Sequence, residues 1–180
     1  MGYIRPDKVG GIVNSFKYKG LTVRVVMDWA MGHVIDNGFK GQIMGSSRNN
    51  NNAIKDAMTN SWQSANDGTK YPKYTVQSDY DYQYRNHMRW DNQIGSSESG
   101  STNNSLYFSK GDYLAFREVS LSYMLPSTWV RKIRLSGVEV FAGAYNIGYI
   151  KKYDGMFPEI YTGVDYGVYP RPRQYNMGVK

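Results

Sequence analysis

The side chains that most often do chemistry in proteins are sparse in this chain. Cysteine is absent, and the two histidines, His33 and His87, lie far apart. No HExxH-type pair, G-x-S-x-G or P-loop sequence occurs. Asp79 and Asp81 could ligate Ca²⁺, but the surrounding residues lack the further carboxylates of a dedicated calcium loop. We therefore expect no metal site, no cofactor and no enzymatic activity.

Aromatic side chains are better placed to recognise a ligand. The 180 residues include 17 Tyr and 4 Trp, and many of them fall in one polar stretch, residues 36–111. Their flat rings could stack on sugar rings or pack against another protein. Alternatively, they pack the stretch onto itself. The candidates for ligand or partner contact are Trp62, Tyr71, Tyr74, Tyr80, Tyr82, Tyr84 and Trp90.

The net charge of +7 raises the question of an acidic partner such as nucleic acid. The basic residues are scattered, and small clusters occur only at Arg131, Lys132 and Arg134, at Lys151 and Lys152, and at Arg171 and Arg173. Single charges near turns need no partner, so we interpret these clusters as solvated turn residues. We expect no nucleic-acid partner.

The elements that would position these residues are β-strands. From Glu118 to Leu125, apolar and polar residues alternate without a break, which is typical of a strand with one apolar and one polar face. Pro126 ends the strand because proline cannot donate to a ladder. Arg117 breaks the pattern, since it falls on the face of Val119, and we expect its side chain to snorkel to the outer rim.

A hairpin near the N-terminus is the clearest local unit. Lys19-Gly20 has the length of a two-residue turn, with glycine available for positive φ. Such a turn pairs Tyr18 with Leu21 and Phe16 with Val23, so that all four fall on the apolar face. Register and hydrophobic pattern agree, which favours the hairpin.

The same alternation predicts five strands, joined by connections that are short, long, short and long in turn. An apolar strand face fits either a soluble sandwich or a barrel wall that meets lipid. Five strands close no membrane barrel, and an open edge is excluded from the bilayer, so a barrel would need further strands. The predicted strands cover about residues 10–19, 20–35, 112–125, 137–150 and 172–180, with long outer loops at 36–111 and 151–171, short periplasmic turns at 19–20 and 126–136, and one helix around residues 54–62.

In a membrane barrel, the charged face of each strand points into the lumen. Lipid rejects a charge at mid-depth by ~2–4 kcal/mol. The side chains predicted to face the lumen are Arg24, Asp28, Glu118, Glu139 and Tyr145.

Two long motifs stand out in the sequence, GDYLAFREVSLSYMLP at residues 111–126 and GVDYGVYPRPR at residues 163–173. These and several other stretches resemble the SusC/RagA family of TonB-dependent outer-membrane transporters, in the family's order and over nearly the whole chain. Residues 5–20 are similar to a late-barrel hairpin of the family, residues 57–62 to a tryptophan-containing loop helix, and residues 138–146 to a further strand.

The resemblance implies a fold and a function. The fold would be all-β: an antiparallel transmembrane β-barrel of ~22 strands around a plug, of which this chain is the last five strands with two long extracellular loops. The remaining strands, the plug and the TonB box would precede Met1, and the closing residues of the last strand would follow Lys180. The whole protein would sit in outer-membrane lipid of a Gram-negative bacterium and import a glycan, or sometimes a peptide. Its partners would be the TonB complex and a SusD-like lipoprotein lid. The alternative is a soluble β-domain that binds glycan or protein through its aromatic-rich loop.

Overall fold

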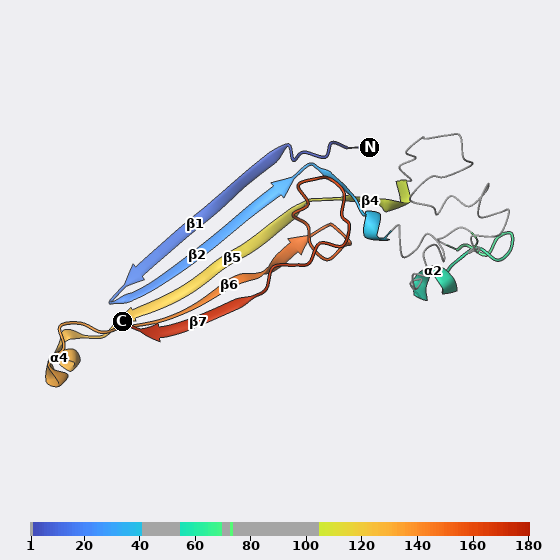
Figure 1. The fold of residues 1–180 in the computed structure, drawn as a ribbon. Helices are drawn as coiled ribbons and strands as arrows, with labels where there is room; N and C mark the ends of the chain where they lie inside the picture. The colour runs from blue at the N-terminus through green and yellow to red at the C-terminus, as the bar shows by residue number, and fades with distance from the viewer. Residues whose placement is uncertain (1, 41–54, 70–72, 74–104) are drawn as a thin grey trace. The chain divides into compact units, whose positions relative to one another are not determined.

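The computed structural model describes residues 2–40, 55–69, 73 and 105–180. The chain divides into two compact units (Figure 1). The sheet unit comprises Met1–His33, Gly111–Asp154 and Tyr169–Lys180, and the loop unit comprises Val34–Lys110 and Gly155–Val168. Among the described residues, no helix is both long and apolar enough to span a membrane.

The sheet unit is one antiparallel sheet of five strands in the order β1-β2-β5-β6-β7 (Figure 1). Each strand pairs with the next one in the sheet through an antiparallel ladder. The described residues are thus mostly antiparallel sheet, as the alternation predicts. The strands are β1 (Lys8–Tyr18), β2 (Leu21–Met31), β5 (Tyr113–Met124), β6 (Glu139–Lys151) and β7 (Gln174–Val179).

The β1–β2 turn confirms the predicted hairpin register. Tyr18 pairs with Leu21 and Phe16 with Val23. Lys19 and Gly20 both have positive φ, 44° and 86°, which is the backbone of a type I′ turn. A Cβ at Gly20 would lie 2.8 Å from the carbonyl oxygen of Met124, so this position requires glycine for space as well as for conformation.

A β-bulge in β5 corrects the placement of Arg117. The β5–β6 register passes from Phe116 to Glu118, and the register against β2 shifts at the same level. One extra residue reverses the parity of a strand, because its side chains alternate between faces. The guanidinium of Arg117 consequently meets the Asp28 carboxylate on the polar face. The expectation that Arg117 shares the face of Val119 and snorkels to the rim is wrong.

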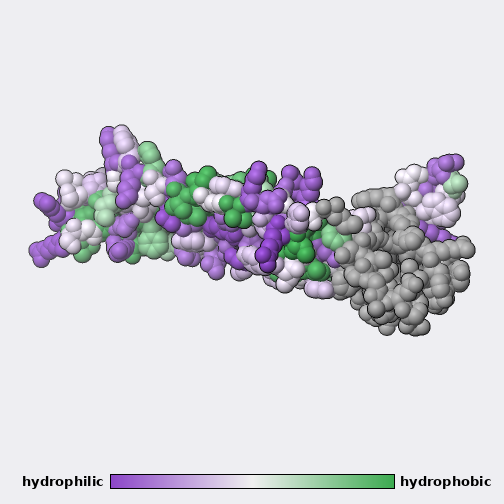
Figure 2. Space-filling view, turned by 90° about the horizontal axis from the view of Figure 1, so that it is seen from above, coloured by the Kyte–Doolittle hydropathy of each residue, from purple (hydrophilic) through white to green (hydrophobic). Residues whose placement is uncertain are grey.

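The two faces of the sheet have opposite character. One cross-strand row is Phe16–Val23–Leu121–Ala142–Met177, and the neighbouring row on the other face is Ser15–Arg24–Ser120–Gly143–Asn176. The apolar row is open: Leu121 is 46% and Met177 87% exposed. Figure 2 shows hydrophobic side chains, in green, gathered on the visible surface of the strands among hydrophilic ones. Exposure of this row is contrary to the packed core that a sandwich would form from it.

Two short helical segments join β5 to β6. They are α4 (Ser127–Val130) and η3 (Arg131–Ile133). Pro126 precedes α4, where its fixed φ of −57° suits the start of a helical turn. Val130 is buried, and its carbonyl accepts a hydrogen bond from Leu135 N at 3.3 Å, which folds the segment back on itself.

The loop unit contains a small sheet and its own core. β3 (Val34–Asp36) pairs antiparallel with β4 (Phe108–Lys110), and η2 (Ser105–Tyr107) precedes β4. The predicted strand at 20–35 is therefore divided into β2 and β3, because Gly32 has φ 85°. The helix α2 (Lys55–Thr59) ends before Trp62. The buried hydrophobic residues of this unit are Ile35, Tyr107, Phe157 and Ile160.

Candidate functional site on the polar face of the sheet

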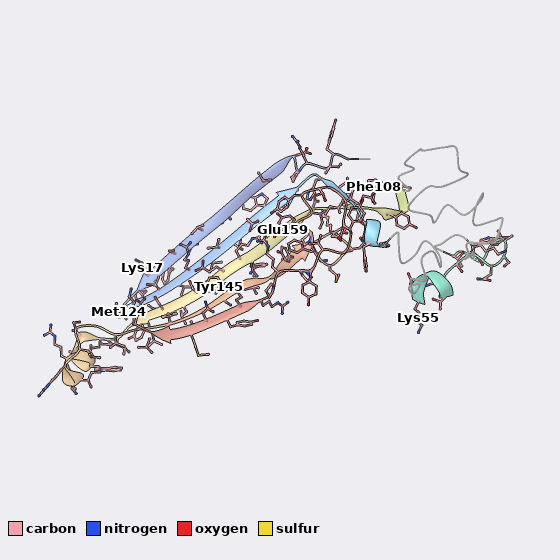
Figure 3. All side chains as sticks on the ribbon, viewed as in Figure 1. Lys17, Lys55, Phe108, Met124, Tyr145 and Glu159 are labelled. Carbon is pink, nitrogen blue, oxygen red and sulfur yellow. The ribbon has the colours of Figure 1, made fainter. Side chains whose placement is uncertain are left out.

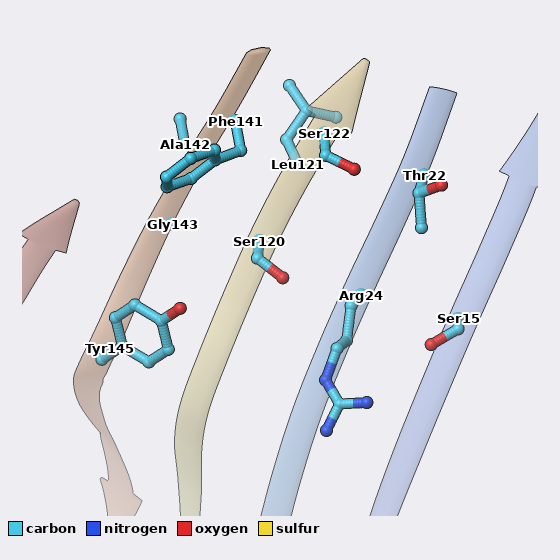
Figure 4. Close-up of a pocket in the computed structure, with 10 residues that line it drawn as sticks. All are labelled: Ser15, Thr22, Arg24, Ser120, Leu121, Ser122, Phe141, Ala142, Gly143 and Tyr145. Atoms are coloured by element: carbon cyan, nitrogen blue, oxygen red, sulfur yellow. The ribbon is translucent and has the colours of Figure 1, made fainter. Parts of the chain in front are cut away.

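The polar face carries a shallow hollow of about 310 Å³ toward the end of the sheet that holds the β1–β2 turn. Alternate residues of neighbouring strands contribute to it, among them Ser15 from β1, Arg24 from β2, Ser120 from β5 and Tyr145 from β6 (Figure 4). The hollow exists because this row of the sheet is made of small residues on either side of Arg24. A Cβ at Gly143 would lie 3.1 Å from the Tyr145 ring, so the glycine leaves space that the ring partly covers.

Two ion pairs cross between β2 and β5 on this face. Arg24 Nε lies 3.4 Å from Glu118 Oε1, and Ser120 Oγ donates to the same oxygen at 2.8 Å. The second pair joins Arg117 to Asp28, with Arg117 Nη2 donating to Asp28 Oδ2 at 2.7 Å. Arg24 and Arg117 thus each have a carboxylate partner on the neighbouring strand.

Tyr149 of β6 extends the second pair. Arg117 Nη1 donates to the Tyr149 hydroxyl at 3.3 Å, and the guanidinium carbon lies 5.8 Å from the ring centroid, within cation–π range. The Tyr149 ring in turn meets Tyr113 edge to face, at a centroid distance of 6.0 Å. This network spans β2, β5 and β6 at the level of the bulge.

The structure brings together four of the five side chains predicted to face a lumen. Arg24, Asp28, Glu118 and Tyr145 share the polar face through the registers of β2, β5 and β6. Glu139 has the same parity but lies at the start of β6, opposite Met124.

Sequence reasoning missed Arg117 as a member of this site, although a signal was present. The apolar residues of β5 fall on even numbers at Leu114 and Phe116 and on odd numbers at Val119 and Leu121. A change of parity within one strand is the mark of an inserted residue. Counting back from Glu118 without that insertion placed Arg117 on the wrong face.

A second polar cluster joins the ends of β2, β5 and β6. Asp112 accepts from Gly32 N and from Lys152 Nζ, both at 2.8 Å. The hydrogen bond from the Lys152 ammonium, followed by that from the Gly32 amide, lowers the pKa of Asp112. The Asp112 carboxylate, which directly precedes β5, thereby links the end of β2 to the end of β6.

His33 is a packing residue in this cluster. Its ring is buried and meets Tyr113 edge to face, and a Cβ at Gly111 would lie 2.3 Å from its Nε2. Burial lowers the pKa of His33, with a smaller opposing effect from the Asp112 charge. The imidazole is therefore neutral near pH 7. Among the residues that the structure describes, no group of three His, Cys, Asp or Glu side chains could hold a metal ion.

The loop aromatics are described only in part. Trp62 is 43% exposed and follows the buried Ser61. The other six candidates, Tyr71, Tyr74, Tyr80, Tyr82, Tyr84 and Trp90, lie outside the described residues, as do His87, Asp79 and Asp81. The loop unit also exposes Tyr161, which the candidates did not include; its hydroxyl donates to Glu159 at 3.4 Å (Glu159 is labelled in Figure 3).

Comparison with known proteins gives consistent relatives. No family model matches the chain. The TonB-dependent receptor P3 of Formosa agariphila is 25% identical over 186 aligned residues, which cover 97% of this chain and 16% of the receptor. A solved structure of the RagAB peptide transporter matches with a TM-score of 0.72 and 21% identity, over 98% of this chain and 17% of that one. The RagAB peptide importer in its closed-closed state matches with a TM-score of 0.71 and 22% identity, over the same shares of the two chains.

This chain spans about a sixth of the length of these relatives. The structural matches show the fold of the strands, and the receptor match extends along nearly the whole sequence. Over nearly its whole length, the chain is therefore similar to one segment of a SusC/RagA-like TonB-dependent receptor, a class of protein found in the Gram-negative outer membrane.

Proposed function

We propose that the five strands form part of the wall of a closed, ~22-stranded outer-membrane barrel that imports a nutrient through its lumen. The apolar face meets acyl chains, and the face of Arg24 and Glu118 lines the plugged interior. The function is transport rather than catalysis. The two loop stretches, residues 36–111 and 151–171, lie on the outer side, and the turns at 19–20 and 126–136 on the periplasmic side.

The observation that carries this proposal is the difference between adjacent residues of one single-layer sheet. Leu121 and Val140 are exposed on one face, whereas Ser120 and Glu118 share a hydrogen bond on the other. In water, exposure of the apolar face is unfavourable by roughly 25 cal/mol for each Å² of apolar surface. A bilayer makes the same face favourable.

We further propose that the cargo is a glycan or a peptide, too large for a porin. Energy comes from the TonB complex, and a SusD-like surface lipoprotein covers the outer loops. The similar RagAB proteins are a peptide transporter and a peptide importer by name, which favours a peptide. Trp62 and the six tyrosine and tryptophan candidates of the same loop would contact cargo or lid through their ring faces.

The barrel wall is tested by moving one charge between adjacent residues in the full-length protein. Leu121→Lys places an ammonium on the lipid face, where a charge costs up to ~2–4 kcal/mol at mid-depth and less toward the strand ends, whereas Ser120→Lys places it on the polar face and should cost far less. The measurement is the yield of heat-modifiable, folded barrel in outer-membrane fractions. Equal yields of the two variants would refute the wall assignment.

The loop aromatics need a separate experiment. Trp62→Ala and Tyr82→Ala, each in the full-length transporter, should reduce either uptake of cargo or binding of the lid lipoprotein. The yield of folded barrel serves as the control for both variants. Unchanged uptake and unchanged lid binding in both variants would remove these rings from the proposed contact surface.

A further inference from the structure

The connection between β5 and β6 exposes large apolar side chains that a simple turn does not need. Trp129, Ile133 and Leu135 are 62%, 64% and 49% exposed, whereas Val130 alone among the apolar residues of the segment is buried. Trp129 and Ile133 are four residues apart across α4 and η3, so they are near neighbours on the surface of the helical segment.

The same segment is strongly basic. Arg131, Lys132 and Arg134 are all exposed, and no Asp or Glu occurs in the sequence between Glu118 and Glu139. Residues 127–135 therefore carry three positive charges and no negative one. Basic side chains beside exposed Trp and aliphatic residues complement a surface that is anionic outside and apolar beneath.

The position of this segment fits such a surface. It lies at the end of the sheet that also holds the β1–β2 turn, since Met124 N donates to the Gly20 carbonyl at 2.9 Å (Figure 1). At the same end of the apolar face, Tyr123 pairs with Val140, and both are exposed. The apolar face thus continues to the strand ends from which the basic segment projects.

We propose that residues 127–135 bind the headgroup layer of anionic phospholipids at the membrane surface on the side of the short connections. This rests on the proposed function, because a headgroup layer adjoins the segment only if the apolar face meets acyl chains. Trp129 and Ile133 enter the interfacial region, where tryptophan is favoured, and the basic side chains reach the phosphates.

The test uses a fluorescent label on one introduced cysteine in an otherwise cysteine-free full-length protein; this chain contributes no cysteine of its own. Ile133→Cys is labelled in vesicles of phosphatidylcholine, with and without phosphatidylglycerol, that contain a headgroup-region quencher lipid. We expect stronger quenching with phosphatidylglycerol and a loss of that increase at high salt.

Removing charge should detach the segment. Each basic residue near an anionic surface is worth about a five-fold change in binding, so Arg131→Gln with Lys132→Gln should lower the ratio of bound to detached segment by about 25-fold. Arg134 is kept because its φ is 61°. Lys8→Gln with Lys110→Gln removes the same charge elsewhere and should leave the quenching unchanged.

A second label, at Leu121→Cys, separates this proposal from the barrel wall. Suppose that brominated acyl chains quench the label at residue 121, but that quenching at residue 133 does not depend on lipid charge, salt or the Gln substitutions. This result would overturn only the headgroup proposal. Shielding of the residue 133 label from both lipid and aqueous quenchers would also overturn it, because a protein would then cover the segment. A Leu121→Cys label that meets no acyl chain would overturn the proposed function itself.

Discussion

Arg117→Leu distinguishes the two possible faces of Arg117 by the sign of its effect on stability. If Arg117 followed the uninterrupted alternation and faced lipid, its replacement by leucine would stabilise the barrel, since a midplane arginine costs ~2–4 kcal/mol. On the polar face, the same substitution removes the partner of Asp28 and destabilises the barrel.

The magnitude follows from the geometry of the pair. Opposite charges about 4 Å apart attract by about 4 kcal/mol at an effective dielectric constant of 20. The side chains remain 21% and 34% exposed, so solvent screening and partial desolvation offset much of this attraction. We expect Arg117→Leu to lower the free energy of unfolding by about 2 kcal/mol, and a coupling of about 1–2 kcal/mol between Arg117→Leu and Asp28→Asn.

The assay is reversible denaturant unfolding of the full-length barrel in lipid vesicles, on the single variants and the double variant. Arg24→Leu is the matched control: Arg24 lies on the same face and pairs with Glu118 at the longer distance of 3.4 Å, with 45% of its side chain exposed. Its loss should therefore cost less than that of Arg117. A stabilised Arg117→Leu protein, or no coupling to Asp28, would refute the bulge placement.

Two further predictions concern the ends of the strands. Gly20→Ala should lower Tm and reduce the free energy of unfolding by at least ~1 kcal/mol, because alanine is strained at positive φ and its Cβ would meet the Met124 carbonyl. The control variant Lys19→Gly should be tolerated. An unchanged Tm for Gly20→Ala would contradict the turn geometry. Because the folded-state pKa of His33 is lowered, the unfolded chain binds more protons than the folded protein below pH about 6.5, so stability should fall as the pH drops through that range. The fall in Tm should be smaller in the His33→Gln variant. A Tm–pH curve of this variant that runs parallel to that of the unsubstituted protein would contradict the role of His33. At more acidic pH, protonation of Asp112, whose folded-state pKa is also lowered, removes the link to Lys152 and Gly32.

Local rules were sufficient for the parts of the fold in which sequence neighbours pair. The Lys19-Gly20 turn fixes the register of β1 against β2, and the hydrophobic alternation needs the same register. Pro126 likewise marks the end of β5 and the start of α4. In each case, one residue type constrains φ or a ladder donor, so the sequence alone carries the information.

Features that depend on strands far apart in sequence were less accessible. The β5 bulge is visible only as a change of parity, and the partner that Arg117 finds lies 89 residues away in β2. The break at Gly32 divides the predicted strand at residues 20–35 into β2 and β3, because the Asp112 carboxylate and the buried His33 hold the chain there. Neither partner can be read from local periodicity.

The pairing on the polar face also determines what the hollow can offer a ligand or a plug. Each of the two mid-sheet arginines is matched by a carboxylate on the neighbouring strand, Arg24 by Glu118 and Arg117 by Asp28. The charges therefore largely cancel on this face, and the row of the hollow presents hydroxyl groups such as that of Ser120 beside the Tyr145 ring. A surface of this kind hydrates readily and holds no fixed anion site. A larger residue in place of Gly143 would fill the hollow, and the loss of Glu118 would remove the carboxylate partner of Arg24, so these two positions keep the polar face open and close to neutral.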